Sequence, residues 1–489
     1  LLWIAVGIGA CGVLATLSKA NGVLLPLLVL ALEASVLRAN PRLRADLQSS
    51  RRLRAWLAFW LLLPALVLAA YLLWQVQYLH DDIWNRPWTR AQRLLTQPRI
   101  LLDYLGLLLV PRVVTAGLFN DGIVASIGLL SPLSTLWSLL GLAALLVTAF
   151  VARRRAPVLS GALLFFFAGH LLESTIIPLE LYFEHRNYLP SMLLFWAIAW
   201  WVAHEERLAR FRPVVALLAI VLLASTLRSR AELWSQPVLQ AKLWALAAPE
   251  SARAQSHASM LEISAGEADK AVVRMRAAWQ AQPMSLQVAL NYANTACEVD
   301  GLTGADNYRL AGTFRRTKEN GTIAPRWLEK AVTVAALHQC AGLALDDVDR
   351  FAASALENPA LNAIPGRRMD LRSIRGMVAI ERGDPLRALA LFDEALAEYP
   401  NPSTAARQSA ALASRGWPSL GLRHLDYFDT IKPLQAHPRP GMAMLQAWVL
   451  DKQGYWANEE AVLRQKMHED IAAGKDQPVV PPAAGAPVP

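Results

Sequence analysis

Three groups of polar and ionisable residues interrupt the apolar first half of this chain. The first is a Ser-Lys-Ala-Asn-Gly motif between two apolar runs, and the second follows the next run. The third starts with His170 and Glu173 and ends with a Glu-His-Arg-Asn-Tyr run that Pro178 and Pro190 bracket. Ionisable side chains at membrane depth are costly, so each is a candidate for function. The candidates are Lys19 and Asn21, then Asp81, Asp82, Arg86 and Arg90, and finally His170, Glu173, Glu184, His185, Arg186 and Tyr188.

These residue types suit the transfer of a sugar from a lipid-linked phosphate at a membrane surface. The leaving phosphate develops negative charge and therefore needs cations beside it. Our candidates for binding the donor phosphate are Lys19, Asn21, Arg186, Arg86 and Arg90. A carboxylate or histidine must take the acceptor proton. Our candidates for that catalytic role are Glu184, His185 and Glu173, while His170, Asp81, Asp82 and Tyr188 are further site candidates.

No other chemistry is indicated by the motifs of this sequence. It contains no metal-ligand spacing, Gly-rich phosphate loop or nucleophile elbow. We therefore predict no metal site and no cofactor, with the lipid-linked sugar acting as substrate. The spacing of His170 and Glu173 also predicts that the two share one helix face.

The composition places these groups in a membrane. Of 489 residues, 54% are hydrophobic and only 18% are charged, and the apolar residues crowd into positions 1–227. This pattern excludes both a wholly soluble protein and a pure membrane bundle. The net charge of +9 comes from three arginine clusters at 38–54, 152–157 and 204–212. Arginines between long apolar runs are typical of cytoplasmic loops, so we predict no nucleic-acid partner.

The apolar runs predict an all-α, polytopic transmembrane domain over residues 1–228. A span needs about 20 mostly apolar residues. Placing the arginine clusters in the cytoplasm leaves 76–131 as one outer loop and puts everything after 228 outside. The chain is then a multi-pass protein of a bacterial inner membrane with a periplasmic C-terminal domain. The predicted spans are 1–15, 18–37, 54–75, 132–151, 158–178, 188–203 and 212–228.

Residues 229–475 carry a repeat typical of tetratricopeptide helical hairpins. Small and apolar residues recur at fixed offsets, which allows two antiparallel helices to approach closely. Such repeats stack into an α-solenoid that binds protein. Residues 476–489 form a Pro/Ala-rich tail that we expect to be disordered. The pattern is clearest at Gly376, Ala388, Phe392, Ala395 and Pro400, with related sets from Ser259 to Pro283 and from Ser409 to Pro433.

The cysteines leave two alternatives open. Cys11 lies in an apolar run, while Cys297 and Cys340 lie in the repeat half. If that half is extracytoplasmic, these two are able to form a disulfide; otherwise both are buried free thiols.

Two short motifs followed by the repeats resemble a known family. The segments are Leu17-Ser-Lys-Ala-Asn-Gly-Val-Leu-Leu-Pro26 and Glu184-His-Arg-Asn-Tyr-Leu-Pro-Ser191. They are similar to the transmembrane and tetratricopeptide-repeat protein O-mannosyltransferases and their bacterial relatives, of the GT-C glycosyltransferase superfamily. The resemblance implies an enzyme that takes a sugar from a polyprenyl-phosphate donor on the outer face. It also implies an acidic residue in a first outer loop, which would precede Leu1, so we expect the sequence to be truncated at its N-terminus.

The expected function is therefore transfer of a sugar to a protein acceptor that the repeats present. One alternative is an oligosaccharide ligase or polymerase of the pilin-glycosylation or O-antigen type, which would transfer preassembled chains. Another is a non-catalytic membrane scaffold that recruits periplasmic proteins through its repeats.

Overall fold

The structure is a computed structural model that describes residues 2–42, 45, 49–79, 88–319, 321–434 and 442–479. Within these ranges the chain is helical and has no β-strand, which confirms the predicted all-α class. The chain divides into two compact units, unit 1 (Leu1–Ala254) and unit 2 (Gln255–Pro489). This division falls later than residue 228 because the last apolar helix continues to Trp234 and a further short helix follows it.

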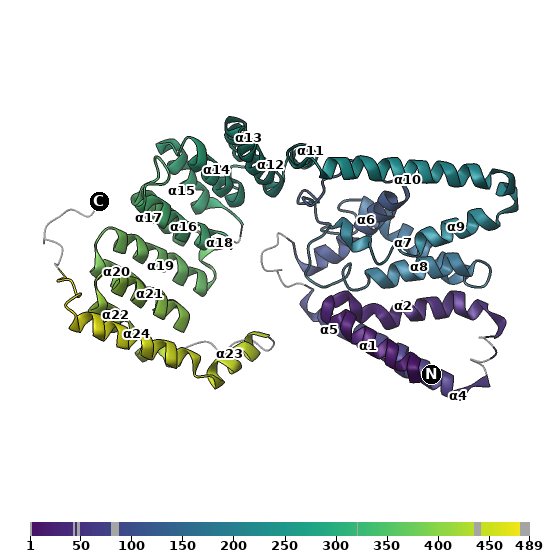
Figure 1. Cartoon of the computed structure of the whole chain (residues 1–489), viewed down its shortest axis with the longest axis horizontal. Coiled ribbons are helices and arrows are strands. Elements are labelled where there is room, and N and C mark those ends of the chain that lie inside the picture. The colour runs from purple at the N-terminus through teal and green to yellow at the C-terminus, as the bar shows by residue number, and fades with distance from the viewer. Residues whose placement is uncertain are drawn as a thin grey trace. The chain divides into compact units, whose positions relative to one another are not determined.

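Unit 1 is a bundle of apolar helices (Figure 1). Its N-terminal part comprises α1 (Leu2–Ser18), η1 (Ala20–Leu24), α2 (Leu25–Leu32), η2 (Glu33–Leu37), α4 (Arg51–Leu57), η3 (Ala58–Leu62), α5 (Leu63–Trp74) and η4 (Gln75–Tyr78). The rest comprises α6 (Arg90–Leu109), α7 (Ser134–Ala152), α8 (Pro157–His170), η5 (Glu184–Asn187), α9 (Leu194–His204), η6 (Glu206–Phe211), α10 (Arg212–Trp234) and α11 (Pro237–Ala247).

In the part of the chain that the structure describes, four stretches of helix are long and apolar enough to cross a membrane: Ala20–Leu37, Arg51–Tyr78, Ser134–Ala152 and Glu206–Trp234. No residue of α10 is buried within the protein, and Leu217, Leu218 and Ile220 are more than half exposed. A continuous exposed apolar surface of this kind indicates a membrane environment.

The prediction of one spanning helix over 158–178 is wrong. Helix α8 ends at His170, and residues 171–183 continue in turns and extended backbone. His170 and Glu173 therefore do not share a helix face. The predicted span 188–203 is also shorter as a helix, because α9 begins only at Leu194.

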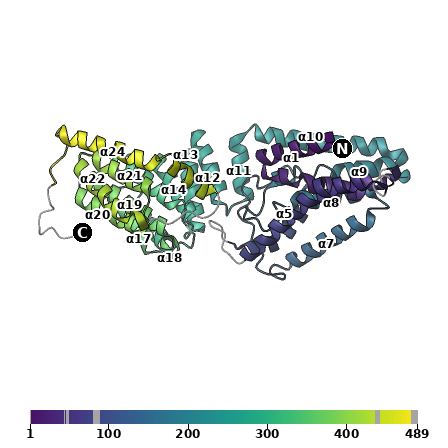
Figure 2. The same ribbon diagram turned by 90° about the horizontal axis from the view of Figure 1, so that it is seen from below.

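Helix α8 is the centre of unit 1, because it packs against α2, α7 and α9. Figure 2 shows α8 beside α9 in a second view. Most α8 side chains are buried, and Phe165 packs with Leu24 and Leu28 while Phe166 packs with Leu142 and Tyr104. Because α8 ends at His170, its packing also fixes the position of Glu173, three residues later.

Residues of the first and third polar groups lie at the opposite end of helices α2 and α8 from Arg38 and from Arg153–Arg155. Asn21 precedes α2 and bonds to Glu173, which follows α8. At the far end of the same pair, Gly161 of α8 lies directly against Ser35 of η2, which is three residues before Arg38. Arg153–Arg155 immediately precede α8 at this end. Helices α2 and α8 therefore run antiparallel, with the predicted site at one end and arginines at the other.

Unit 2 is an array of paired helices (Figure 1). Helix α12 (Ala252–Ser264) begins at the boundary between the units. The others are α13 (Ala268–Ala281), α14 (Leu286–Val299), α15 (Gly304–Arg316), α16 (Ala324–Ala336), α17 (Leu345–Glu357), α18 (Pro359–Asn362), α19 (Pro365–Glu381), α20 (Pro385–Glu398), α21 (Pro402–Ser414), α22 (Pro418–Ile431), η7 (Lys432–Leu434), α23 (Met442–Lys452) and α24 (Tyr455–Ala472).

Small residues set the spacing within these pairs. A Cβ atom on Gly376 of α19 would lie 2.3 Å from the ring of Phe392 of α20, so only glycine fits there. Ala388, Phe392 and Ala395 are fully buried, as the sequence pattern requires of them. In the next pair, a Cβ on Gly421 would lie 2.8 Å from the carbonyl oxygen of Ser409. Three of the helix pairs, α12–α13, α19–α20 and α21–α22, have a glycine with positive φ in the turn between their helices. These glycines are Gly266, Gly383 and Gly416.

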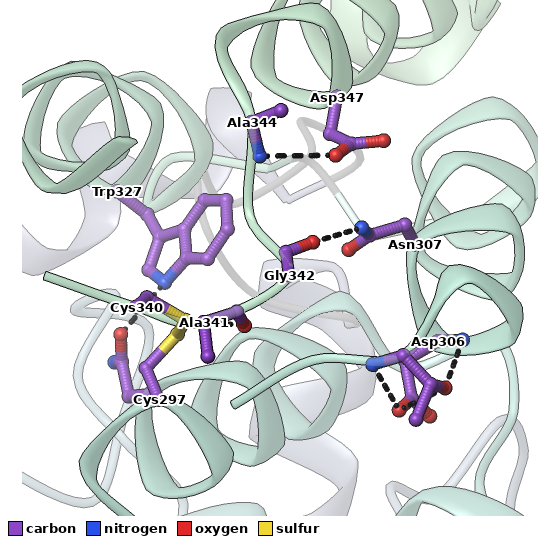
Figure 3. Close-up of a disulfide and its surroundings, with 11 residues drawn as sticks. Cys297, Asp306, Asn307, Trp327, Cys340, Ala341, Gly342, Ala344 and Asp347 are labelled. Atoms are coloured by element: carbon purple, nitrogen blue, oxygen red, sulfur yellow. Dashed lines mark hydrogen bonds between the residues drawn. A yellow bond between two sulfur atoms is a disulfide. The ribbon is translucent and has the colours of Figure 1, made fainter. Parts of the chain in front are cut away.

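Cys297 and Cys340 form a disulfide (Figure 3). It joins the end of α14 to the loop before α17. Two residues that follow α14 also donate hydrogen bonds to backbone carbonyls of that loop. The Leu302 amide donates to the Ala341 carbonyl over 2.8 Å, and the Asn307 side chain donates to the Gly342 carbonyl over 2.7 Å. Of the two alternatives for these cysteines, the structure has the disulfide.

The predicted disordered tail, 476–489, starts too early. The Gln477 amide donates to the Gly416 carbonyl over 2.8 Å, the Asp476 carboxylate accepts from Ser419, and Val479 packs on the α19–α22 core. Residues 480–489 lie outside the described residues.

Candidate functional site

The predicted site is built around one carboxylate, that of Glu173. Asn21 Nδ2 donates to Glu173 Oε1 over 2.7 Å, and Lys19 Nζ lies 3.8 Å from the same oxygen. Arg186 Nε lies 3.5 Å from Oε2. The turn after α1 thus meets the segment that follows α8, 152 positions later in the chain, and together they bring two cations to one anion.

A sharp turn after α1 positions Lys19 and Asn21. Helix α1 ends at Ser18, Lys19 is extended, and η1 begins at once. Gly22 lets η1 lie directly on the last turns of α1, because a Cβ there would be 2.2 Å from the Ala15 carbonyl carbon. The turn buries Asn21 and leaves the Lys19 side chain 61% exposed.

Residues 171–183 form a strap of non-helical backbone, which we call the 171–183 strap. Helix α6 supplies hydrogen-bond donors to it from one face. Arg93 is fully buried and donates to the carbonyls of Glu173, Thr175 and Leu179. One turn on, Gln97 donates to Leu181, and Tyr104 donates to Phe183 over 2.9 Å. Non-helical backbone at membrane depth needs such partners, so α6 makes the strap possible.

Arg186 is largely occupied by the same strap. It is buried, and its Nη1 donates to the Glu180 carbonyl over 2.7 Å in addition to the ion pair with Glu173. Arg186 therefore fixes the shape of the site, and Lys19 is the cation of this cluster that faces solvent.

The other predicted site residues lie around this cluster. Glu184 is partly exposed and pairs with Arg230 of α10 at 3.6 Å. His185 is exposed, with its ring 5.1 Å from that of Phe183, and Tyr188 is 85% exposed.

Two predicted residues are placed away from Glu173. His170 is buried and bonds to Ser174 rather than to Glu173, with its ring stacked on Tyr104. Arg90, predicted to bind phosphate, donates to Gln75 over 2.9 Å and covers the Tyr78 ring. Asp81, Asp82 and Arg86 lie outside the described residues.

The predicted set omits Arg93, Tyr104 and Arg230, all of which shape this site. A signal for the first two was present in the sequence. Arg93, Gln97 and Tyr104 are spaced by 4 and 7 residues, which places them on one face of a helix. Among the described residues no cluster of His, Cys, Asp or Glu is arranged to hold a metal ion.

No family model matches this chain, and no curated protein matches it.

Proposed function

We propose that this chain is a membrane glycosyltransferase of the GT-C type that uses a polyprenyl-phosphate sugar and modifies a protein. The observation that supports this most directly is the charge balance at Glu173. Lys19 and Arg186 share one carboxylate, and Arg93 adds a third cation against the backbone of the same residue. An anion that binds beside Lys19 would balance this excess, and a lipid phosphate reaches such a site from the membrane.

The outer side of the membrane is the proposed place of the reaction. Arg38 and Arg153–Arg155 lie at the helix ends remote from Glu173, and arginines between apolar runs favour the cytoplasm. The Cys297–Cys340 disulfide supports the same assignment, because disulfides persist in oxidising compartments such as the bacterial periplasm. Both features agree with a site and a unit 2 on the periplasmic side.

Glu184 and His185 are our proposed proton acceptors. Glu173 already balances two cations, so its proposed role is to position Lys19 and Arg186. Glu184 and His185 lie on η5, next to Arg186, and are accessible to an acceptor. A group that takes the acceptor proton must be reachable in this way.

Unit 2 is proposed to be a tetratricopeptide-repeat domain that presents the acceptor. Support comes from the three helix pairs whose small residues are buried at the repeat offsets, with a positive-φ glycine in each turn. Arrays of this kind bind protein segments along one face.

Lys19→Gln tests the donor site without disturbing the fold. The side chain is mostly exposed, so we expect the thermal unfolding temperature to stay unchanged. Loss of a charge-assisted contact should weaken binding of a polyprenyl monophosphate, and lower sugar transfer, by roughly tenfold or more. Binding is measured by the shift in unfolding temperature with added lipid phosphate, and transfer by glycoprotein analysis of cells carrying each variant.

Arg154→Gln is the matched control, because Arg154 is an exposed cation at the opposite end of the helices. Equal lipid binding and equal sugar transfer by Lys19→Gln and the control would contradict the donor-site proposal. If transfer never occurs but unit 2 still captures proteins, the chain is a scaffold. Transfer of preassembled chains in place of single sugars would instead indicate a ligase.

A further inference from the structure

Unit 2 contains a cavity of about 570 Å³ between helices α16, α19, α20 and α21. Its volume is in the range of sites that bind ligands. Charged and apolar side chains both line it. The charged ones are Arg326, Glu329, Asp370 and Arg407, and the other lining residues used below are Ile374, Met377 and Gln408.

Asp370 is the unusual member of this lining. It is half-buried, and no hydrogen bond or ion pair reaches its carboxylate from any part of the chain that the structure describes. The nearby cation Arg407 is already paired with Glu329, whose carboxylate lies 3.2 Å from it. The cavity therefore contains a carboxylate that lacks a partner.

An unpaired carboxylate here opposes folding. Burial raises the pKa of Asp370, and it outweighs the opposing effect of Arg407 and Arg367. A raised pKa means that the folded chain binds a proton more tightly than the unfolded chain, so this group lowers stability as pH rises from the usual pKa of an aspartate through its raised pKa. A contribution to stability does not explain Asp370, whereas a bound cation would.

The rest of the lining combines a fixed polar side chain with apolar side chains. Gln408 is buried and fixed by Ser373 at 2.6 Å and by His424 at 2.9 Å. His424 is itself fully buried against Asp393 at 2.7 Å. Ile374 and Met377 supply apolar surface, and methionine adapts its shape to a flexible chain.

We propose that this cavity binds a lysine or arginine side chain of a protein segment held by unit 2. The cationic head pairs with Asp370, and the aliphatic stem lies on Ile374 and Met377. Basic side chains combine a charged tip with an apolar stem, so they match the carboxylate and the apolar side chains of the lining at once. This inference rests on the proposal that unit 2 binds protein, and it names the chemistry that the bound segment must carry.

The test uses the full chain in detergent, without donor lipid, and the blocked tripeptides acetyl-Ala-X-Ala-amide. X is lysine, arginine, norleucine or glutamate, and binding is detected by saturation-transfer NMR. We expect the lysine and arginine peptides to bind roughly tenfold more tightly than the norleucine peptide, because a charged hydrogen bond contributes about 1.5–3 kcal/mol. Asp370→Asn should abolish that preference, while Asp269→Asn, at an exposed position on α13, should retain it.

Stability separates loss of binding from loss of folding. At neutral pH the Asp370→Asn variant should unfold at the same temperature as the unmodified chain or higher, because it removes an unpaired carboxylate. Tighter binding of the glutamate peptide, equal binding of norleucine and lysine, or an unchanged preference in Asp370→Asn would each overturn the inference. None of these results touches the Lys19 site, and failure of Lys19→Gln leaves the peptide binding unaffected.

Discussion

Gly22→Ala is expected to reduce sugar transfer by about a hundredfold and to destabilise unit 1. The added Cβ would lie 2.2 Å from the Ala15 carbonyl carbon and 2.3 Å from the Thr16 amide nitrogen. Both are backbone atoms and cannot move aside as a side-chain tip does, so η1 must shift. Overpacking of this kind costs about 1–3 kcal/mol or more. A shift of about 1 Å in a group that positions a substrate costs roughly a hundredfold in rate.

The shift matters because Gly22 adjoins Asn21 and lies three residues from Lys19. Moving η1 would lengthen the 2.7 Å bond between Asn21 and Glu173 and withdraw Lys19 from the same carboxylate. Transfer in cells and thermal unfolding in detergent measure the two effects. Gly7→Ala is the control, since nothing lies within 4 Å of a Cβ at Gly7 in α1. Unchanged stability and transfer in Gly22→Ala would show that this close approach does not position the site.

The sequence predicts the helices of unit 1 better than the backbone between them. Apolar runs of about 20 residues give long helices such as α7, because hydropathy and length determine a span. Residues 171–181 are almost as apolar but form the 171–183 strap. Their backbone bonds to Arg93 and Tyr104, which lie about 80 positions earlier in the chain. A hydropathy pattern contains no information about a hydrogen-bond partner so distant in the sequence. The span predicted from it therefore continues past the end of α8 at His170.

In the candidate site, too, one part is predictable from the sequence and another part is not. Lys19, Asn21, Glu173 and Arg186 are all site candidates from the sequence, and the structure brings them together. Burial was not predictable from their positions. It makes Arg186 a structural residue and leaves Lys19 exposed. The pairing of Glu184 with Arg230 was also missed, because it depends on how α10 packs.

In unit 2, removal of the Cys297–Cys340 disulfide is expected to cost about 4 kcal/mol. The bond closes a loop across 43 positions, and the entropy of closing a loop of this length in the unfolded chain corresponds to about that free energy. A domain of this size shifts by about 2–4 °C per kcal/mol. The double variant Cys297→Ala/Cys340→Ala should therefore unfold roughly 8–16 °C lower. Cys11→Ala is the control, since Cys11 is exposed and unpaired.

A reducing agent provides an independent test of this disulfide. It should lower the unfolding temperature of the unmodified chain toward that of the double variant and leave the double variant unchanged. The same bond also reports the compartment of unit 2. In the Cys11→Ala background, chain taken from cells and denatured without reductant should bind no maleimide, and should bind it at Cys297 and Cys340 after reduction. Immediate labelling of both cysteines would mean that unit 2 folds in a reducing compartment. The site at Glu173 would then no longer be assigned to the outer face on the strength of this bond.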